Sequence, residues 1–221
     1  EQLSRHALIV SSSGGGKTTF SHLLMHQLLQ VGKRLLIVDP KDDSNIFPAF
    51  YPDFLILDED APLNLLQVPS YLTLPEFIAI FTTCFARAYY GGEHLKQILN
   101  EGLRRVFSAT STPSLKDLSK AVQLMYSIKD TYARRDAIQG VLQRLARIEQ
   151  QYPAMFQCRQ GISYDELFLH SLYLPVKTMA ETQEFIISLL VHHLYYHNRA
   201  KNIRDKLKFI VYLDEGLLSW N

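Results

Sequence analysis

The sequence predicts an α/β fold with a mostly parallel central sheet, helices on both faces and a helical insertion. Three observations lead to this prediction. Short apolar runs alternate with helical patterns near the start of the chain, a glycine-rich loop joins the first run to the first helix, and a late apolar run ends in two acids. A strand that is apolar throughout is buried on both faces, which is typical of parallel sheets covered by helices.

The predicted strands share an uninterrupted apolar character over strand length. They cover residues 7–10, 34–40, 54–60, 171–176 and 208–215. The spacing predicts a helix over 20–30, directly after the glycine-rich loop, and a largely buried helix over 181–200. Strands that alternate with helices in this way favour βαβ units.

The middle of the chain changes to helical spacing. Predicted helices follow Pro75, the Gly91-Gly92 break and Pro113, and a further one carries an apolar face from Ile138 to Ile148. We therefore divide the chain into a first part of a P-loop core (1–74), a helical insertion (75–165) and a second part of the core (166–221). The chain begins with Glu rather than Met and stops just after a strand pattern, so we expect a piece of a longer protein.

The composition excludes several classes of protein. With 221 residues, 47% of them hydrophobic and 20% charged, the chain has enough apolar residues for a sizeable core. Lys and Arg number 23 against 22 acids, so the net charge creates no basic field for nucleic acid. No apolar run is long enough to span a membrane, and the two cysteines form no CxxC pair. These features predict a cytoplasmic protein.

Residues 11–18 read S-S-S-G-G-G-K-T and match the phosphate-loop pattern G-x-x-x-x-G-K-[ST] at all but the first position. Small residues let backbone N–H groups converge on phosphates at a helix N-terminus. We expect Lys17 to reach the β- and γ-phosphates of ATP, and Thr18 to place its hydroxyl on Mg²⁺. The predicted nucleotide-binding residues are Ser13, Gly14, Gly15, Gly16, Lys17, Thr18 and Thr19.

Two acids at the end of the last predicted strand complete a hydrolase site. Asp214 is expected to hold Mg²⁺ through water, and Glu215 to polarise the attacking water as general base. Together with Lys17, Glu215 is the predicted catalytic residue. A second acidic stretch, Asp-Pro-Lys-Asp-Asp (39–43), follows the second strand at the sheet edge where ligands bind in open α/β folds. An ordinary polar turn explains this stretch equally well.

These three stretches, S-S-S-G-G-G-K-T-T, V-D-P-K-D-D and V-Y-L-D-E, resemble the HerA/FtsK superfamily of P-loop ATPases, and HerA-like helicases and conjugative translocases most. The segment A-P-L-N-L-L (61–66) is similar to an asparagine-containing segment of that family. The resemblance implies a RecA-like core of the ASCE type. It also implies that Asp39, Lys41 and Asp43 support the residues that contact the nucleotide, without contacting it themselves.

The resemblance implies an ATPase, with ATP and Mg²⁺ as cofactors, that translocates or unwinds double-stranded DNA as a ring-shaped homo-hexamer. An associated nuclease or other effector is an expected partner. An arginine from one subunit would complete its neighbour's site. Arg144 and Arg147 are the named candidates, among the insertion arginines Arg104, Arg105, Arg134, Arg135, Arg144 and Arg147.

Two other functions stay open: an ATP-dependent regulatory switch in a larger defence or signalling assembly, and an ATPase that moves protein in secretion. His192, His193 and His197 share part of a predicted helix, but no carboxylate or cysteine stands at metal-ligand spacing from them. We therefore interpret the three histidines as a packed cluster.

Overall fold

The computed structural model describes residues 9, 14–127, 131–176, 181–201 and 209–213. The chain forms two compact units. Unit 1 comprises Glu1–Leu57, Phe168–Thr178 and Asn198–Asn221, and unit 2 comprises Asp58–Leu167 and Met179–His197. The domain boundaries at residues 74 and 165 stay a prediction.

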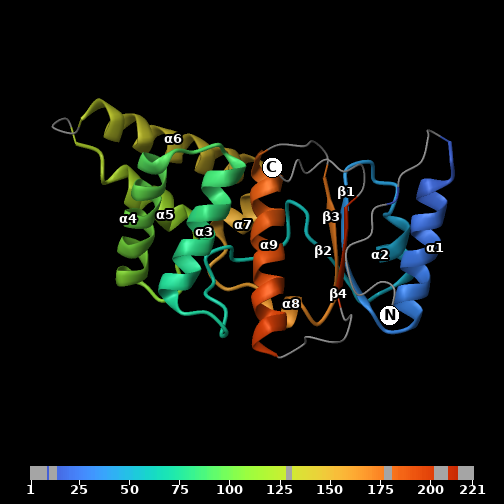
Figure 1. The fold of residues 1–221 in the computed structure, drawn as a ribbon. Coiled ribbons are helices and arrows are strands. Elements are labelled where there is room, and N and C mark those ends of the chain that lie inside the picture. Colours follow the sequence, from blue (N-terminus) through green and yellow to red (C-terminus); the bar gives the residue numbers. More distant parts are fainter. Residues whose placement is uncertain (1–8, 10–13, 128–130, 177–180, 202–208, 214–221) are drawn as a thin grey trace. The chain divides into compact units, whose positions relative to one another are not determined.

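Unit 1 contains a four-stranded parallel sheet in the order β2-β3-β1-β4 (Figure 1). The strands are β1 (Arg34–Asp39), β2 (Phe54–Ile56), β3 (Ser171–Pro175) and β4 (Phe209–Leu213). The parallel sheet expected from the apolar runs is confirmed. Strand β2 is shorter than the predicted 54–60, because the chain turns after Leu57. The predicted strand 7–10 lies outside the described residues except for Ile9.

Two helices, α1 (Lys17–Gln30) and α2 (Ile46–Phe50), pack on one face of this sheet (Figure 1). Met25 of α1 and Phe47 of α2 meet alternate strand residues, namely Leu35 and Ile37 of β1, Phe54 of β2 and Tyr173 of β3. The intervening residues of β1 and β3, Leu36, Val38, Leu172 and Leu174, are buried as well. A strand with both faces buried reads as a continuous apolar run, which explains why the sequence pattern predicted these strands.

The helix α1 and the strand β1 run in opposite directions and are joined by a tight turn at Val31–Lys33 (Figure 1). Fourteen helical residues rise about 21 Å, and six strand residues extend about 20 Å. The two elements are therefore equally long. The start of α1 returns to the carboxyl end of β1, which brings Lys17 and Asp39 to the same end of unit 1.

Unit 2 is helical. Its helices are α3 (Leu74–Ala88), α4 (Glu93–Ala109), α5 (Leu115–Gln123), α6 (Tyr132–Gln151), α7 (Pro153–Gln157), α8 (Tyr164–Leu167) and most of α9 (Glu181–Ala200). The helix α4 packs against α3, α5 and α6. The helical block and the helix over 181–200 were predicted from their periodicity. The short helices α2, α7 and α8 were not, because four or five residues carry too little periodicity.

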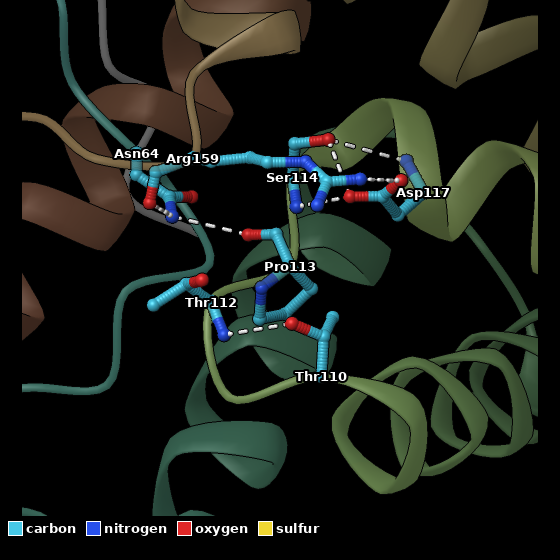
Figure 2. A network of polar contacts seen from close by, with 7 residues as sticks. All are labelled: Asn64, Thr110, Thr112, Pro113, Ser114, Asp117 and Arg159. Carbon is cyan, nitrogen blue, oxygen red and sulfur yellow. Dashed lines mark hydrogen bonds and ion pairs between the residues drawn. The ribbon is translucent and has the colours of Figure 1, made fainter.

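Capping boxes start two of these helices. Thr73 and Glu76 close the first turn of α3, where Glu76 Oε2 accepts the Thr73 N–H at 2.8 Å. Ser114 and Asp117 do the same for α5. Such reciprocal bonds satisfy backbone N–H groups that have no partner within the helix. Arg159 extends the second box with an Nη2 donor 2.8 Å from Asp117 Oδ1 (Figure 2).

Asn64 joins three segments of unit 2 (Figure 2). Its side chain is buried, and its Nδ2 donates to the carbonyl oxygens of Pro113 and Arg159, each at 3.0 Å. Its Oδ1 accepts the N–H of Leu66 at 2.9 Å. A buried polar side chain with all of these bonds made stabilises a loop that has no regular secondary structure of its own.

Replacing Asn64 with Ala should lower the free energy of unfolding by about 2–4 kcal/mol, because buried backbone groups lose their partners. Urea denaturation followed by circular dichroism measures the change. The exposed Gln97 of α4 supplies the matched control Gln97→Ala, which should leave the free energy of unfolding near the parent value. Equal stabilities of the two variants would show that Asn64 does not join these segments.

The histidines of α9 pack within aromatic side chains. The ring of His193 is fully buried, lies 4.2 Å from the Tyr164 ring centroid and stacks on Phe77 at 5.8 Å. His197 packs edge-on against Tyr71 and places Nδ1 3.4 Å from Asp165 Oδ1. Burial, with a smaller contribution from the nearby His192, lowers the pKa of His193 to about 3. The His193 ring is therefore neutral in the folded chain.

Acid should destabilise the chain through His193. The unfolded chain binds a proton at this ring below pH 6.5 while the folded chain does not until about pH 3. Between these values the free energy of unfolding should fall by up to about 1.4 kcal/mol per pH unit. Urea denaturation at several pH values measures the slope. The variant His193→Phe should have a shallower slope, whereas Gln97→Ala, which replaces an exposed side chain without an ionisable group, should keep the parent slope.

Candidate functional site

The glycine loop at the start of α1 has the backbone expected of a phosphate cradle. Gly14 and Gly16 have φ angles of 78° and 75°, a left-handed conformation that favours glycine. Among the described residues, no atom comes within 4 Å of a Cβ atom built at either position. Ser11, Ser12 and Ser13 lie outside the described residues.

The first turn of α1 is able to bind an anion. Gly16 is the N-cap residue and has no side chain with which to cap the turn. The first helical bond runs from the Phe20 N–H to the Gly16 oxygen at 2.9 Å, and the preceding N–H groups of the turn have no partner within the helix. The turn contains no acid, and Lys17 and Thr18 are partly exposed there. These donors and the helix dipole suit phosphate oxygens.

The second part of the site is the loop after β1. The Asp39 carboxylate is buried, with 1% of the residue exposed. It accepts the Ser44 N–H at 2.6 Å and the Lys41 N–H at 3.1 Å, and the Tyr173 hydroxyl oxygen lies 3.0 Å from its Oδ2. A buried carboxylate is stable only with donors of this kind. The hydrogen bonds of Asp39 therefore stabilise the loop that follows β1.

The other side chains of this loop reach the surface. Lys41, Asp42 and Asp43 are exposed. Asp42 adopts a φ of 59°, and its carboxylate contacts the Tyr173 hydroxyl at 2.7 Å and the Asn45 Nδ2 at 3.2 Å. The predicted polar turn is thus a structured loop whose charged groups lie at the phosphate-loop end of unit 1.

Two residues that the sequence reasoning missed connect this loop to the sheet and to α1. Tyr173 of β3 contacts both Asp39 and Asp42, and His22 of α1 places Nε2 3.2 Å from Ser44 Oγ. A tyrosine inside an otherwise apolar strand is a usable signal, because a buried hydroxyl seeks a polar partner. His22 gives no such signal, since its partner lies 22 positions away in sequence.

The predicted hydrolase acids, Asp214 and Glu215, lie outside the described residues. The strand that leads to them, β4, is described and pairs in parallel with β1, with Leu213 opposite Val38. The carboxyl ends of neighbouring parallel strands meet at one edge of a sheet. The described end of β4 therefore lies beside the end of β1, and the roles of Asp214 and Glu215 stay a prediction.

The two named candidate finger arginines make contacts within unit 2. Arg144 donates to the carbonyl oxygens of Gly140 and Tyr89 at 2.8 and 3.1 Å, and its guanidinium lies 5.8 Å from the Tyr89 ring centroid. Arg147 Nη1 lies 3.4 Å from Glu181 Oε2. An arginine-finger role for either residue stays a prediction.

The described residues contain no group of three or more histidine, cysteine or acidic side chains arranged to hold a metal ion. His192 contacts the Ser188 carbonyl oxygen at 2.8 Å and the Cys84 sulfur at 3.5 Å. Burial raises the pKa of Cys84 to about 12, so this thiol keeps its proton. Among the helices that the structure describes, none is both long enough and apolar enough to span a membrane.

Comparison with known families gives one match. Residues 1–170 match the family model described as Helicase HerA, central domain. The chain belongs to this HerA family. The match includes the phosphate loop, the Asp39 loop and the Asn64 segment, and it stops before β4. No curated protein matches the chain.

Membership of the HerA family makes the chain a P-loop ATPase domain of the HerA/FtsK type with a RecA-like fold, consistent with the parallel sheet. The family implies ATPase activity in general terms. The residues present fit ATP and Mg²⁺, because the N–H groups that precede Phe20 in the first turn of α1 have no partner within the helix and the Thr18 hydroxyl belongs to the same turn.

The buried Asp39 carboxylate should be the main contributor to the stability of the loop. Replacing Asp39 with Ala leaves the N–H groups of Lys41 and Ser44 without their acceptor and should lower the free energy of unfolding by about 2–4 kcal/mol. Urea denaturation measures this loss. The variant Asp43→Ala removes an exposed carboxylate from the same loop and should change stability by less than about 0.5 kcal/mol. Similar losses in both variants would contradict the central role of Asp39.

Proposed function

We propose that this chain is the ATPase domain of a ring-shaped motor that hydrolyses ATP to translocate along or unwind double-stranded DNA. The observation that carries the ATPase part is the glycine loop, with Gly14 and Gly16 in the left-handed conformation at the start of α1, in a chain of the HerA family. The motor part is supported by the description of the matching family as a helicase.

Each side chain has a defined role in the proposal. The N–H groups from Gly14 to Thr19 bind the phosphates, and Lys17 neutralises charge that develops on the β- and γ-oxygens. Thr18 and, through water, Asp214 hold Mg²⁺, which supplies further charge neutralisation when bound. Glu215 accepts a proton from the attacking water.

The Asp39 loop forms a supporting layer in this proposal. Asp39 fixes the loop backbone through its bonds to Lys41 and Ser44, and the side chains of Lys41 and Asp43 remain exposed near the nucleotide end of the sheet. A charged side chain held by a rigid backbone orients water or phosphate at little entropic cost. We assign Lys41 and Asp43 this role.

The helix α4 offers a surface for an anionic partner such as DNA. Lys96, Asn100 and Arg104 recur every four residues, so they lie along one side of α4 about 6 Å apart. They line a cavity of about 390 Å³ between α3 and α4. Arg104 is exposed and, within the part of the chain that the structure describes, no acid pairs with its guanidinium. Glu93 lines the same cavity and pairs with Lys96 at 3.6 Å, so Arg104 is the charged donor of this row that suits a phosphate.

A homo-hexamer with ATP between subunits is part of the proposal, with a finger arginine supplied by the neighbouring subunit. Because Arg144 and Arg147 already make contacts in their own subunit, their use as fingers requires those contacts to open. An associated nuclease or effector would act on the DNA that the ring moves.

ATP turnover measured with and without duplex DNA tests the function. The full chain should hydrolyse ATP, and duplex DNA should raise the turnover several-fold. Lys17→Ala should abolish nucleotide binding, and Glu215→Gln should retain binding while losing hydrolysis, typically by 10²-fold or more. Lys116→Ala, an exposed lysine on α5, is the matched control and should behave as the parent.

Three outcomes separate the alternatives. Turnover that duplex DNA leaves unchanged, from a chain that stays monomeric with ATP by analytical ultracentrifugation, contradicts the DNA motor. Very slow turnover combined with ATP-dependent assembly favours a regulatory switch. Normal hydrolysis by Glu215→Gln would show that the general base is another residue.

A further inference from the structure

The hydroxyl of Tyr173 lies between two carboxylates. Its Oη is 2.7 Å from Asp42 Oδ1 and 3.0 Å from Asp39 Oδ2. The residue is 3% exposed, and its ring packs in the core with Met25 of α1 and Phe47 of α2. Burial and the two neighbouring acids raise the pKa of Tyr173, so the phenol keeps its hydrogen.

A single hydrogen serves only one of these carboxylates at a time. A phenol has one O–H donor, so the second carboxylate oxygen faces its lone pairs. Asp39 already accepts two backbone N–H groups, from Lys41 and Ser44. The exposed Asp42 carboxylate also accepts the Asn45 amide at 3.2 Å. The contact with Asp42 is the shorter of the two, and it assigns the Tyr173 hydrogen to Asp42.

This bond acts on a residue with an uncommon backbone. Asp42 has a φ of 59°, a left-handed conformation that non-glycine residues adopt rarely and that neighbouring contacts must hold. The Tyr173 hydroxyl and the Asn45 amide provide those contacts. The direction of the chain at Asp42 determines where the flanking side chains of Lys41 and Asp43 project.

Strand pairing and core packing fix the position of the Tyr173 ring. Tyr173 pairs with Ile37 in the parallel register of β1 and β3, and its ring lies under α1, the helix that starts at the phosphate loop. The same loop is connected to α1 a second time through Ser44 and His22 at 3.2 Å. The position of the Tyr173 hydroxyl is therefore fixed relative to α1, the helix that follows the phosphate loop.

We propose that Tyr173 is a positioning residue of the nucleotide site: its hydroxyl holds the left-handed backbone of Asp42 and so orients Lys41 and Asp43 at the phosphate-loop end of unit 1. This inference rests on the proposed ATPase function for its catalytic consequence. Its structural part, the fixed loop, is independent of any nucleotide.

The structural part is tested without ATP by limited trypsin digestion. The Lys41–Asp42 bond lies in the loop, and a held loop resists cleavage. Tyr173→Phe should be cut several-fold faster at this bond than the parent chain. Tyr164→Phe, which removes the hydroxyl of a buried tyrosine in unit 2, is the matched control and should be cut at the parent rate. An unchanged rate in Tyr173→Phe overturns the proposal whether or not the chain hydrolyses ATP.

The catalytic part is tested by steady-state ATP hydrolysis. A displacement of the loop by about 1 Å should lower kcat of Tyr173→Phe by about tenfold to a hundredfold and leave KM within about twofold. Loss of stability alone would instead reduce the amount of active protein, which thermal unfolding at the assay temperature detects. A kcat equal to that of the parent would refute the positioning role.

A second substitution should rescue the first. Glycine adopts positive φ without a steric penalty, so Asp42→Gly in the Tyr173→Phe background should restore the loop without the hydroxyl. We expect the double variant to recover most of the parent kcat and to resist trypsin again. Failure of this rescue, with a stable double variant, would show that Tyr173 does not act through the backbone of Asp42. A parent chain with no ATP turnover refutes the proposed function and leaves the trypsin result to decide the loop.

Discussion

The arrangement of unit 1 depends on one buried charge, the carboxylate of Asp39. A carboxylate with 1% exposure at the end of a strand is stable only when donors surround it. Those donors are backbone N–H groups of the following loop, so satisfying one charge fixes the loop, and the Tyr173 hydroxyl of β3 contacts the same loop through Asp42. The sheet edge at which nucleotides bind in α/β proteins is thereby made rigid.

Unit 2 uses a neutral group in a comparable way. Asn64 has both donors and an acceptor, so it joins two carbonyl oxygens and one N–H that belong to separate segments. The helices around it carry their own capping boxes and pack through apolar faces. In both units a buried polar side chain organises irregular backbone, and apolar packing supplies the remaining stability.

The fold and the phosphate loop were largely predictable from local patterns. Apolar strands, helical periodicity and the Gly-Gly-Gly-Lys-Thr stretch act within a few residues of one another, so the sequence displays them directly. The partners of Asp39 and Asp42 were not predictable in this way. Tyr173 is 134 positions from Asp39, and His22 meets Ser44 only because α1 folds back along β1.

By itself, the sequence determined that this protein has a parallel α/β sheet, a phosphate loop and membership of an ATPase family, because propensity, periodicity and loop chemistry are local properties. Only the tertiary structure decided what the acids after β1 do. It buries Asp39, turns Asp42 into a left-handed conformation and leaves Asp43 exposed, although the three carboxylates lie within five residues. The reason is physical: burial and hydrogen-bond partners, rather than residue type, set the role of a carboxylate.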